Sequence, residues 1–175
     1  MKNKILFLLI FTLLSCKRES KFNLEKDLYQ FTEKMENGDT IEITADLSAC
    51  TYAGKEKYTF TKQSDSLFIE TFSEAGSFEK KSQILPKMFY PIKAKDSLSF
   101  ENYFDYLKKN EVPVRQRPLI TIFYKNKYQS YIFSDSDLSD KFNKLGNLNL
   151  IRKKLYPKDD FFKVEEPPPP PPPEK

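Results

Sequence analysis

The sequence predicts an α+β fold in which an antiparallel sheet, built from a four-strand meander plus a hairpin, has helices packed on one side. Apolar and polar residues alternate with period two in four segments between residues 40 and 85, and in two more between residues 119 and 133. Such alternation is typical of strands with one buried face. Segments with helical spacing of apolar residues precede, separate and follow these strands. Short loops between consecutive strands favour antiparallel pairing.

The first helix is predicted over residues 24–36. Asn23 is suited to the N-cap, and Asn37-Gly38 is suited to end the helix. The apolar residues of this segment recur at helical spacing and are Leu24, Leu28, Phe31 and Met35. We therefore expect a single domain over residues 23–164, preceded by a polar tether over residues 16–22.

The meander is predicted to contain strands at 40–48, 56–62, 66–72 and 78–85. Turn residues separate them at 52–55, 63–65 and 74–77. The third strand carries apolar residues at both parities, because Phe68 and Phe72 alternate with Leu67 and Ile69. Pro86 and Pro91 then enclose an expected aromatic loop over residues 87–90.

A second helix is predicted over residues 97–110, with Ser97 or Ser99 as its cap and Pro113 beyond its end. Strands follow at 119–124 and 128–133. Lys125-Asn126-Lys127 forms the turn between them, and Asn126 is expected to adopt the left-handed conformation.

The last helical region is predicted to start after Ser134-Asp135-Ser136-Asp137 and to break at Gly146-Asn147. A short further helical segment is expected at 148–155, before Pro157. Seven prolines at 167–173 then predict a disordered proline-rich tail over 165–175, which is either a spacer or ligand for a partner or an inert end.

Composition excludes several classes of function. The chain has 16 Phe and 10 Tyr, enough aromatic area for a core, but no His and no Trp. Without His, a His-based catalytic triad and a His metal site are excluded. The formal net charge of +4 predicts no strong nucleic-acid binding. No spacing identifies a catalytic group, a metal site or a cofactor site, although distant acids among the 25 Asp and Glu could still converge.

The first sixteen residues have the design of a secretory signal. Lys2 and Lys4 precede an apolar run over residues 5–14, which is shorter than the roughly 20 residues of a membrane span. The end of this segment, Leu13-Leu14-Ser15-Cys16, resembles the lipobox of bacterial lipoprotein precursors. The alternative is an ordinary signal peptide with an incidental cysteine.

The resemblance covers only the first tenth of the chain, and it implies a cellular location rather than an activity. Lipoprotein precursors are cut before the cysteine, so residues 1–15 would be the signal peptide and Cys16 would carry the lipid. Lys17 replaces the aspartate that retains enterobacterial lipoproteins in the inner membrane. The resemblance therefore implies a bacterial cell-envelope protein, lipid-anchored in a membrane that we expect to be the outer membrane, on either its periplasmic or its surface face.

Candidate contact residues are aromatic or basic. Tyr90 and Tyr103, with Met88, Phe89 and Phe104, could line a ligand groove, and core packing is the favoured alternative. Arg115 and Arg117 could bind phosphate or acidic polymers, or could form a solvated connector.

Cys50 and the aspartates after the hairpin have structural explanations. Cys50 is expected to be a small buried hydrophobe rather than a reactive thiol, since no His is present to activate it. Asp135, Asp137 and Asp140 are expected to cap a helix rather than to bind calcium.

Three hypotheses for function remain. The first is a non-enzymatic interaction module of immunity or assembly-accessory type, which predicts an exposed patch or sheet edge. The second is a small-ligand or peptide-binding lipoprotein, which predicts a concave, partly apolar pocket. The third is a His-free hydrolase, which requires acids or a Ser/Lys pair with shifted pKa values in a cleft.

Overall fold

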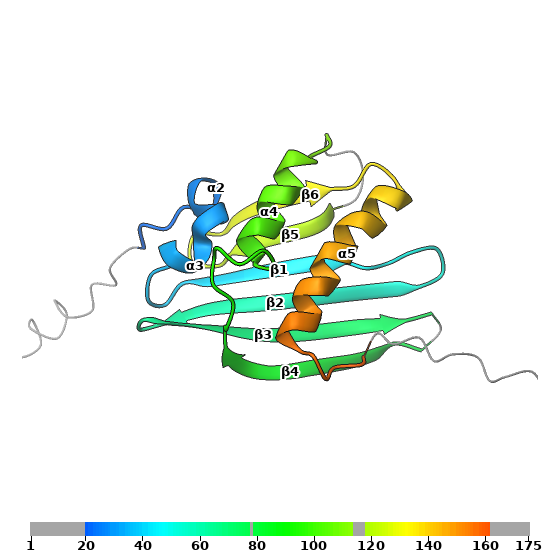
Figure 1. Cartoon of the computed structure of the whole chain (residues 1–175), viewed down its shortest axis with the longest axis horizontal. Helices are drawn as coiled ribbons and strands as arrows, with labels where there is room; N and C mark the ends of the chain where they lie inside the picture. The colour runs from blue at the N-terminus through cyan, green and yellow to red at the C-terminus, as the bar shows by residue number, and fades with distance from the viewer. Residues whose placement is uncertain (1–19, 78, 114–117, 162–175) are drawn as a thin grey trace, which may run out of the picture.

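A computed structural model describes residues 20–77, 79–113 and 118–161. It contains one six-stranded antiparallel sheet with strand order β4-β3-β2-β1-β5-β6, and the helices lie over one of its faces (Figure 1). The predicted α+β class is confirmed. The meander and the hairpin form one sheet of six strands because β5 pairs with β1, with Ile122 opposite Ile43.

The strands are β1 (Thr40–Asp46), β2 (Ala53–Gln63), β3 (Ser66–Gly76), β4 (Lys81–Phe89), β5 (Pro118–Tyr124) and β6 (Gln129–Ser134). The helical elements are α2 (Leu24–Asp27), the 3-10 turn η1 (Leu28–Gln30), α3 (Phe31–Lys34), α4 (Phe100–Lys109) and α5 (Leu138–Leu155). None of the helices in the described ranges is long and apolar enough to cross a membrane.

The core lies between the helices and the inner face of the sheet. Alternate residues of the central strands point into it, as period two requires; the largest of these are Tyr58, Phe60, Ile120, Ile122 and Tyr124, all fully buried. The Phe100 ring of α4 meets the rings of Tyr58 and Phe60 at centroid distances of 5.0 and 5.2 Å. These edge-to-face contacts fix α4 across the middle of the sheet.

The segment 24–36 is broken into α2, η1 and α3 rather than being one helix. The predicted cap is present, since the Asn23 side chain accepts from the Lys26 N–H at 3.1 Å. The break coincides with a contact to α4. The Thr32 N–H donates to Glu101 Oε1 at 3.1 Å, where a continuous helix would have it bond the carbonyl four residues earlier. Folded structure also begins before residue 23: Phe22 is 1% exposed, so the end of the expected tether packs into the core.

The first hairpin turns earlier than expected. Ala49 and Tyr52 exchange backbone hydrogen bonds of 2.9 and 2.8 Å, so the turn consists of Cys50 and Thr51, and β2 already begins at Ala53. Cys50 has φ 48° and is exposed. The prediction that Cys50 is a buried hydrophobe is wrong, because the tip of a two-residue hairpin loop leaves nothing to cover its side chain.

Strand β4 continues through Pro86 to Phe89, so most of the expected aromatic loop over 87–90 is strand. Proline is tolerated here because β4 is an edge strand and the register with β3 shifts between Ile69 and Thr71, opposite Pro86.

In the β5–β6 loop, the left-handed residue is Tyr128 (φ 54°) and not Asn126. The Asn126 side chain instead accepts from the Thr40 N–H at 3.0 Å and donates to the Gly38 carbonyl at 3.1 Å. It therefore ties the loop to the start of β1.

Helix α5 runs from Leu138 to Leu155 without a break at Gly146-Asn147. The predicted interruption is wrong because packing on both sides of it holds the helix: Lys144 lies before it, and Leu148 and Ile151 lie after it, all buried. The capping prediction is confirmed for Asp137, which accepts from the Asp140 N–H at 2.9 Å.

Candidate functional site

An apolar cluster lies on the sheet face opposite the helices, next to the β4 edge. Phe68 pairs with Phe89, and Phe72 pairs with Ile84, so these four side chains share one face of β3 and β4. We call them the aromatic patch. Ile84 is 68% exposed and Phe89 is 61% exposed. Ile69 and Thr71, which alternate with Phe68 and Phe72 along β3, are fully buried. The patch therefore lies on the outward face.

One lysine, Lys87, contacts the aromatic patch. The rings of Phe68 and Phe89 lie edge to face at 6.4 Å, and Lys87 Nζ lies 5.1 Å from the centroid of the Phe68 ring. Residues 79–93 contain four lysines, Lys80, Lys81, Lys87 and Lys93, against one acid, Glu79. Glu70 and Glu74 share the outward face of β3 with the patch, and Lys80 pairs with Glu74 at 3.3 Å. The charge around the patch is therefore mixed, with Lys87 as its direct cationic contact.

The edge of β4 is interrupted for backbone pairing. Pro86 lacks an N–H, and the register shift beside it breaks the row of donors and acceptors. Bulges, prolines and lysines on edge strands prevent uncontrolled strand addition. The chemistry available at this edge is therefore side-chain contact through the patch, not a continuous added strand.

A shallow groove of about 460 Å³ contains Tyr90, one of the predicted contact residues. It lies between α3, the start of β3 and the segment after β4, and its lining includes Leu67, Phe89 and Ile92. The Tyr90 ring packs on Phe60 at 5.0 Å. Its hydroxyl is buried, and burial raises the pKa of Tyr90 above the ordinary value although the backbone of Phe100 opposes the shift.

Tyr103 does not line this groove. It is 3% exposed on α4, in ring contact with Phe104 at 6.1 Å, and it belongs to the core. The structure thus separates the two tyrosines that the sequence suggested as one contact site. Arg115, Arg117 and Cys16 lie outside the described residues.

A buried polar cluster joins α5 to the sheet, and sequence reasoning did not find it. Glu56 Oε1 accepts from Arg152 Nε at 2.5 Å and from the Ser73 hydroxyl at 3.2 Å, and Glu56 Oε2 accepts from the Tyr58 hydroxyl at 2.6 Å. Arg152 also pairs with Asp159. Burial raises the pKa of Glu56 even though Tyr58 and Arg152 oppose the shift.

The cluster lies at the floor of a second groove, of about 360 Å³, whose apolar walls include Leu47, Tyr52 and Phe142. Both carboxylate oxygens of Glu56 are already engaged by Arg152, Ser73 and Tyr58. A general base must lie within hydrogen-bond reach of its substrate, and the Glu56 side chain is 3% exposed. The arrangement is therefore suited to holding α5 on the sheet rather than to acid–base chemistry.

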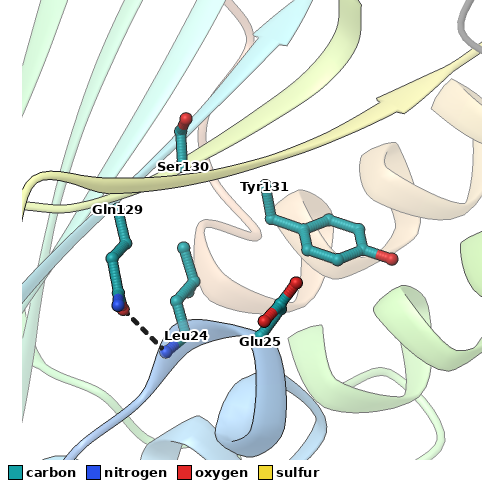
Figure 2. A pocket seen from close by; sticks show the side chains of 5 residues that line it. All are labelled: Leu24, Glu25, Gln129, Ser130 and Tyr131. Atoms are coloured by element: carbon teal, nitrogen blue, oxygen red, sulfur yellow. Dashed lines mark hydrogen bonds between the residues drawn. The ribbon is translucent and has the colours of Figure 1, made fainter.

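A third pocket, of about 270 Å³, lies between the start of α2 and β6 (Figure 2). Gln129 Oε1 accepts from the Leu24 N–H at 3.2 Å, and the Glu25 carboxylate points toward the Tyr131 ring. Tyr131 interacts with Tyr29, and burial and this neighbour raise the pKa of Tyr29 to about 12. The pocket is small and polar, and its contacts attach α2 to the edge of the sheet.

Comparison of the chain with models of known families, with curated proteins and with solved structures gave no match.

Proposed function

We propose that this chain is a lipid-anchored protein of the bacterial cell envelope that binds another protein through the aromatic patch of β3 and β4. The patch is the observation that carries the proposal: two large apolar side chains, Ile84 and Phe89, are more than 60% exposed side by side with Phe68 and Phe72. Of the three hypotheses, the interaction module is the one that predicts such a surface.

The anchor rests on the sequence Leu13-Leu14-Ser15-Cys16 after a charged and apolar leader. No helix in the described part of the chain could span a bilayer. Membrane attachment would then depend on the acyl chains at Cys16, each buried CH₂ contributing about 0.8 kcal/mol. More than one chain is needed for stable attachment.

The proposed partner is a protein with an apolar surface that carries an acidic group opposite Lys87. A partner that covers Phe68, Phe72, Ile84 and Phe89 removes apolar area from water. This burial stabilises the complex by about 25 cal/mol per Å² of buried area. Lys87, which lies over the Phe68 ring, would favour an acidic group at that point of the rim.

The Tyr90 groove supports a second candidate function, the binding of a small ligand or peptide. The specific observation is the Tyr90 side chain, which lines the groove and whose hydroxyl is buried behind it. A ligand with a hydrogen-bonding group that displaces the groove wall could engage this hydroxyl. Tyr90→Phe would then weaken such binding while leaving patch-dependent binding unchanged.

The test is capture of partners from envelope membranes with the acylated protein. Ile84→Ser/Phe89→Ser, and separately Lys87→Glu, are expected to lose a partner that the wild type retains. Leu150→Ser on α5, which is 49% exposed, is the matched control and is expected to retain it. A partner bound equally by all four proteins would contradict the patch.

The anchor is tested separately. Cys16→Ser is expected to abolish labelling by a palmitate analogue and to release the protein from the membrane fraction. Label that persists on this variant would contradict lipidation at Cys16.

A further inference from the structure

We propose that the end of the sheet that carries the β5–β6 loop, residues 125–128, rests on the membrane, with the side chain of Tyr128 in the headgroup region. This inference rests on the proposed anchor at Cys16. It adds an orientation of the domain and a specific lipid contact. The surface that this end contacts is the phospholipid headgroup region. The short chain between the anchor and the folded domain is the reason, because it keeps this end close to the bilayer.

The anchor and the first described residue are four residues apart, at Cys16 and Ser20. Four residues span at most about 14 Å, whatever their conformation. Strands β2 and β3, of 11 residues each, are about 36 Å long. The domain is therefore longer than the link that holds it, and the part nearest Ser20 must stay close to the bilayer.

Ser20 is fixed at one end of the sheet. Its hydroxyl donates to Asp39 Oδ2 at 3.0 Å, just before β1, and the Phe22 ring packs edge to face on Tyr124 at 4.9 Å. Lys127 Nζ donates to the Phe22 carbonyl at 3.0 Å. The start of the described chain and the β5–β6 loop are thus neighbours, as Figure 1 shows for α2 and the adjoining ends of β5 and β6.

Tyr128 is the residue of this loop suited to a bilayer interface. It is 85% exposed in the loop with φ 54°, and its ring meets the Phe123 ring edge to face at 6.3 Å. Tyrosine is enriched at headgroup depth because its ring is apolar and its hydroxyl is polar. An unburied aromatic ring held at the end nearest the anchor has the chemistry of an interfacial contact.

Both ends of the sheet carry charges of both signs. The end near Ser20 presents exposed Lys21, Lys26 and Lys125, and Lys125 pairs with Glu42 at 3.0 Å. Exposed Glu25 and Asp65 lie at the same end. The orientation is therefore set by the length of the tether and by Tyr128, and the lysines of this end can meet anionic headgroups.

The absence of tryptophan from the chain allows a direct measurement. Single-tryptophan variants Tyr128→Trp and Thr51→Trp place one fluorophore at the proposed contact and one at the exposed tip of the opposite hairpin. In a Cys50→Ser background, the chain from residue 16 onward is coupled through its Cys16 thiol to maleimide-headgroup lipid. The vesicles contain phosphatidylethanolamine and phosphatidylglycerol with brominated acyl chains. This chemical attachment reproduces the tether even if the cell does not acylate Cys16.

We expect Tyr128→Trp to be quenched several-fold more than Thr51→Trp and to shift its emission to the blue on the vesicles. Equal quenching of both positions would mean that the domain lies flat, and absence of quenching at position 128 would mean that the loop points into solvent. Either result overturns the orientation. Palmitate labelling of the cellular protein tests lipidation at Cys16 independently. A wrong anchor proposal is therefore distinguishable from a wrong membrane contact at Tyr128.

Discussion

Arg152 and Glu56 form a buried ion pair between α5 and β2, although 96 residues separate them. Arg152 Nε lies 2.5 Å from Glu56 Oε1, and their side chains are 6% and 3% exposed. The guanidinium also reaches Asp159 beyond the end of the helix. One arginine therefore joins the sheet, the helix and the segment that follows it.

Replacing Arg152 by methionine is expected to destabilise the fold by about 3–5 kcal/mol, because Glu56 is left buried without its cation. Urea unfolding followed by circular dichroism measures the loss. Lys153→Met, at the adjacent exposed position, is the control and is expected to cost less than about 0.5 kcal/mol. Glu56→Gln added to Arg152→Met is expected to recover part of the stability, and equal losses for the two single variants would contradict a structural ion pair.

Glu101 makes the stability of the fold depend on pH. Its Oε1 accepts from the N–H and the hydroxyl of Thr32, whereas its Oε2 is buried with no hydrogen-bond partner in the described part of the chain. Burial raises the pKa of Glu101 above its ordinary value of 4.5. Between the two pKa values the folded state therefore keeps a proton that the unfolded state loses. The contribution of Glu101 to the free energy of unfolding is highest below pH 4.5, and it falls as the pH rises from 4.5 through the raised pKa of the folded state.

Glu101→Gln removes this ionisation, so its free energy of unfolding is expected to fall less than that of the wild type as pH rises above 4.5. Denaturant titrations of both proteins at a series of pH values measure the difference. Glu25→Gln, on the exposed first turn of α2, is the control. Parallel pH profiles for Glu101→Gln and the wild type would show that Glu101 is ionised in the folded protein at no cost.

The sequence predicted the strands better than the helices and turns. Period-two alternation predicted the inward residues of β1 and β2, since a strand has only two faces. Pro86 and Gly146 predict breaks that the structure does not contain. An edge position accommodates the first, and packing on both sides of it overrides the second.

The contacts that define the candidate sites were harder to predict. Glu56 and Arg152 carry no local pattern that pairs them across 96 residues. The aromatic patch did leave a signal, because Phe68 and Phe72 give β3 apolar residues at both parities. Its other half, Ile84 and Phe89, became visible only once the register between β3 and β4 was known.

The register of the β5–β6 hairpin can be tested with one substitution on each face of β5. Ile122 is fully buried between Ile43 and Tyr131, whereas Thr121 points to the opposite face. Ile122→Asp is expected to cost about 4 kcal/mol or more, because it places a carboxylate in the core. Thr121→Asp is expected to cost less than about 1 kcal/mol. Thermal unfolding distinguishes them, and a reversed order would mean that β5 is inserted with the other face inward.

Gly146 and Gly38 offer a matched pair in which the same substitution has opposite effects. Gly146 lies inside α5, and a Cβ there meets nothing within 4 Å. Gly146→Ala is therefore expected to stabilise the protein by about 0.5–1 kcal/mol, because alanine loses less backbone entropy in a helix. Gly38 has equal space but φ +91°, in the region that L-residues avoid.

Gly38→Ala is therefore expected to destabilise the protein by about 1–2 kcal/mol, because the cost comes from the backbone conformation and not from a clash. Urea unfolding of the two variants beside the wild type measures both changes. A gain for Gly146→Ala would establish that α5 is continuous through residue 146. A loss there would restore the helix break that the Gly146-Asn147 pair predicts.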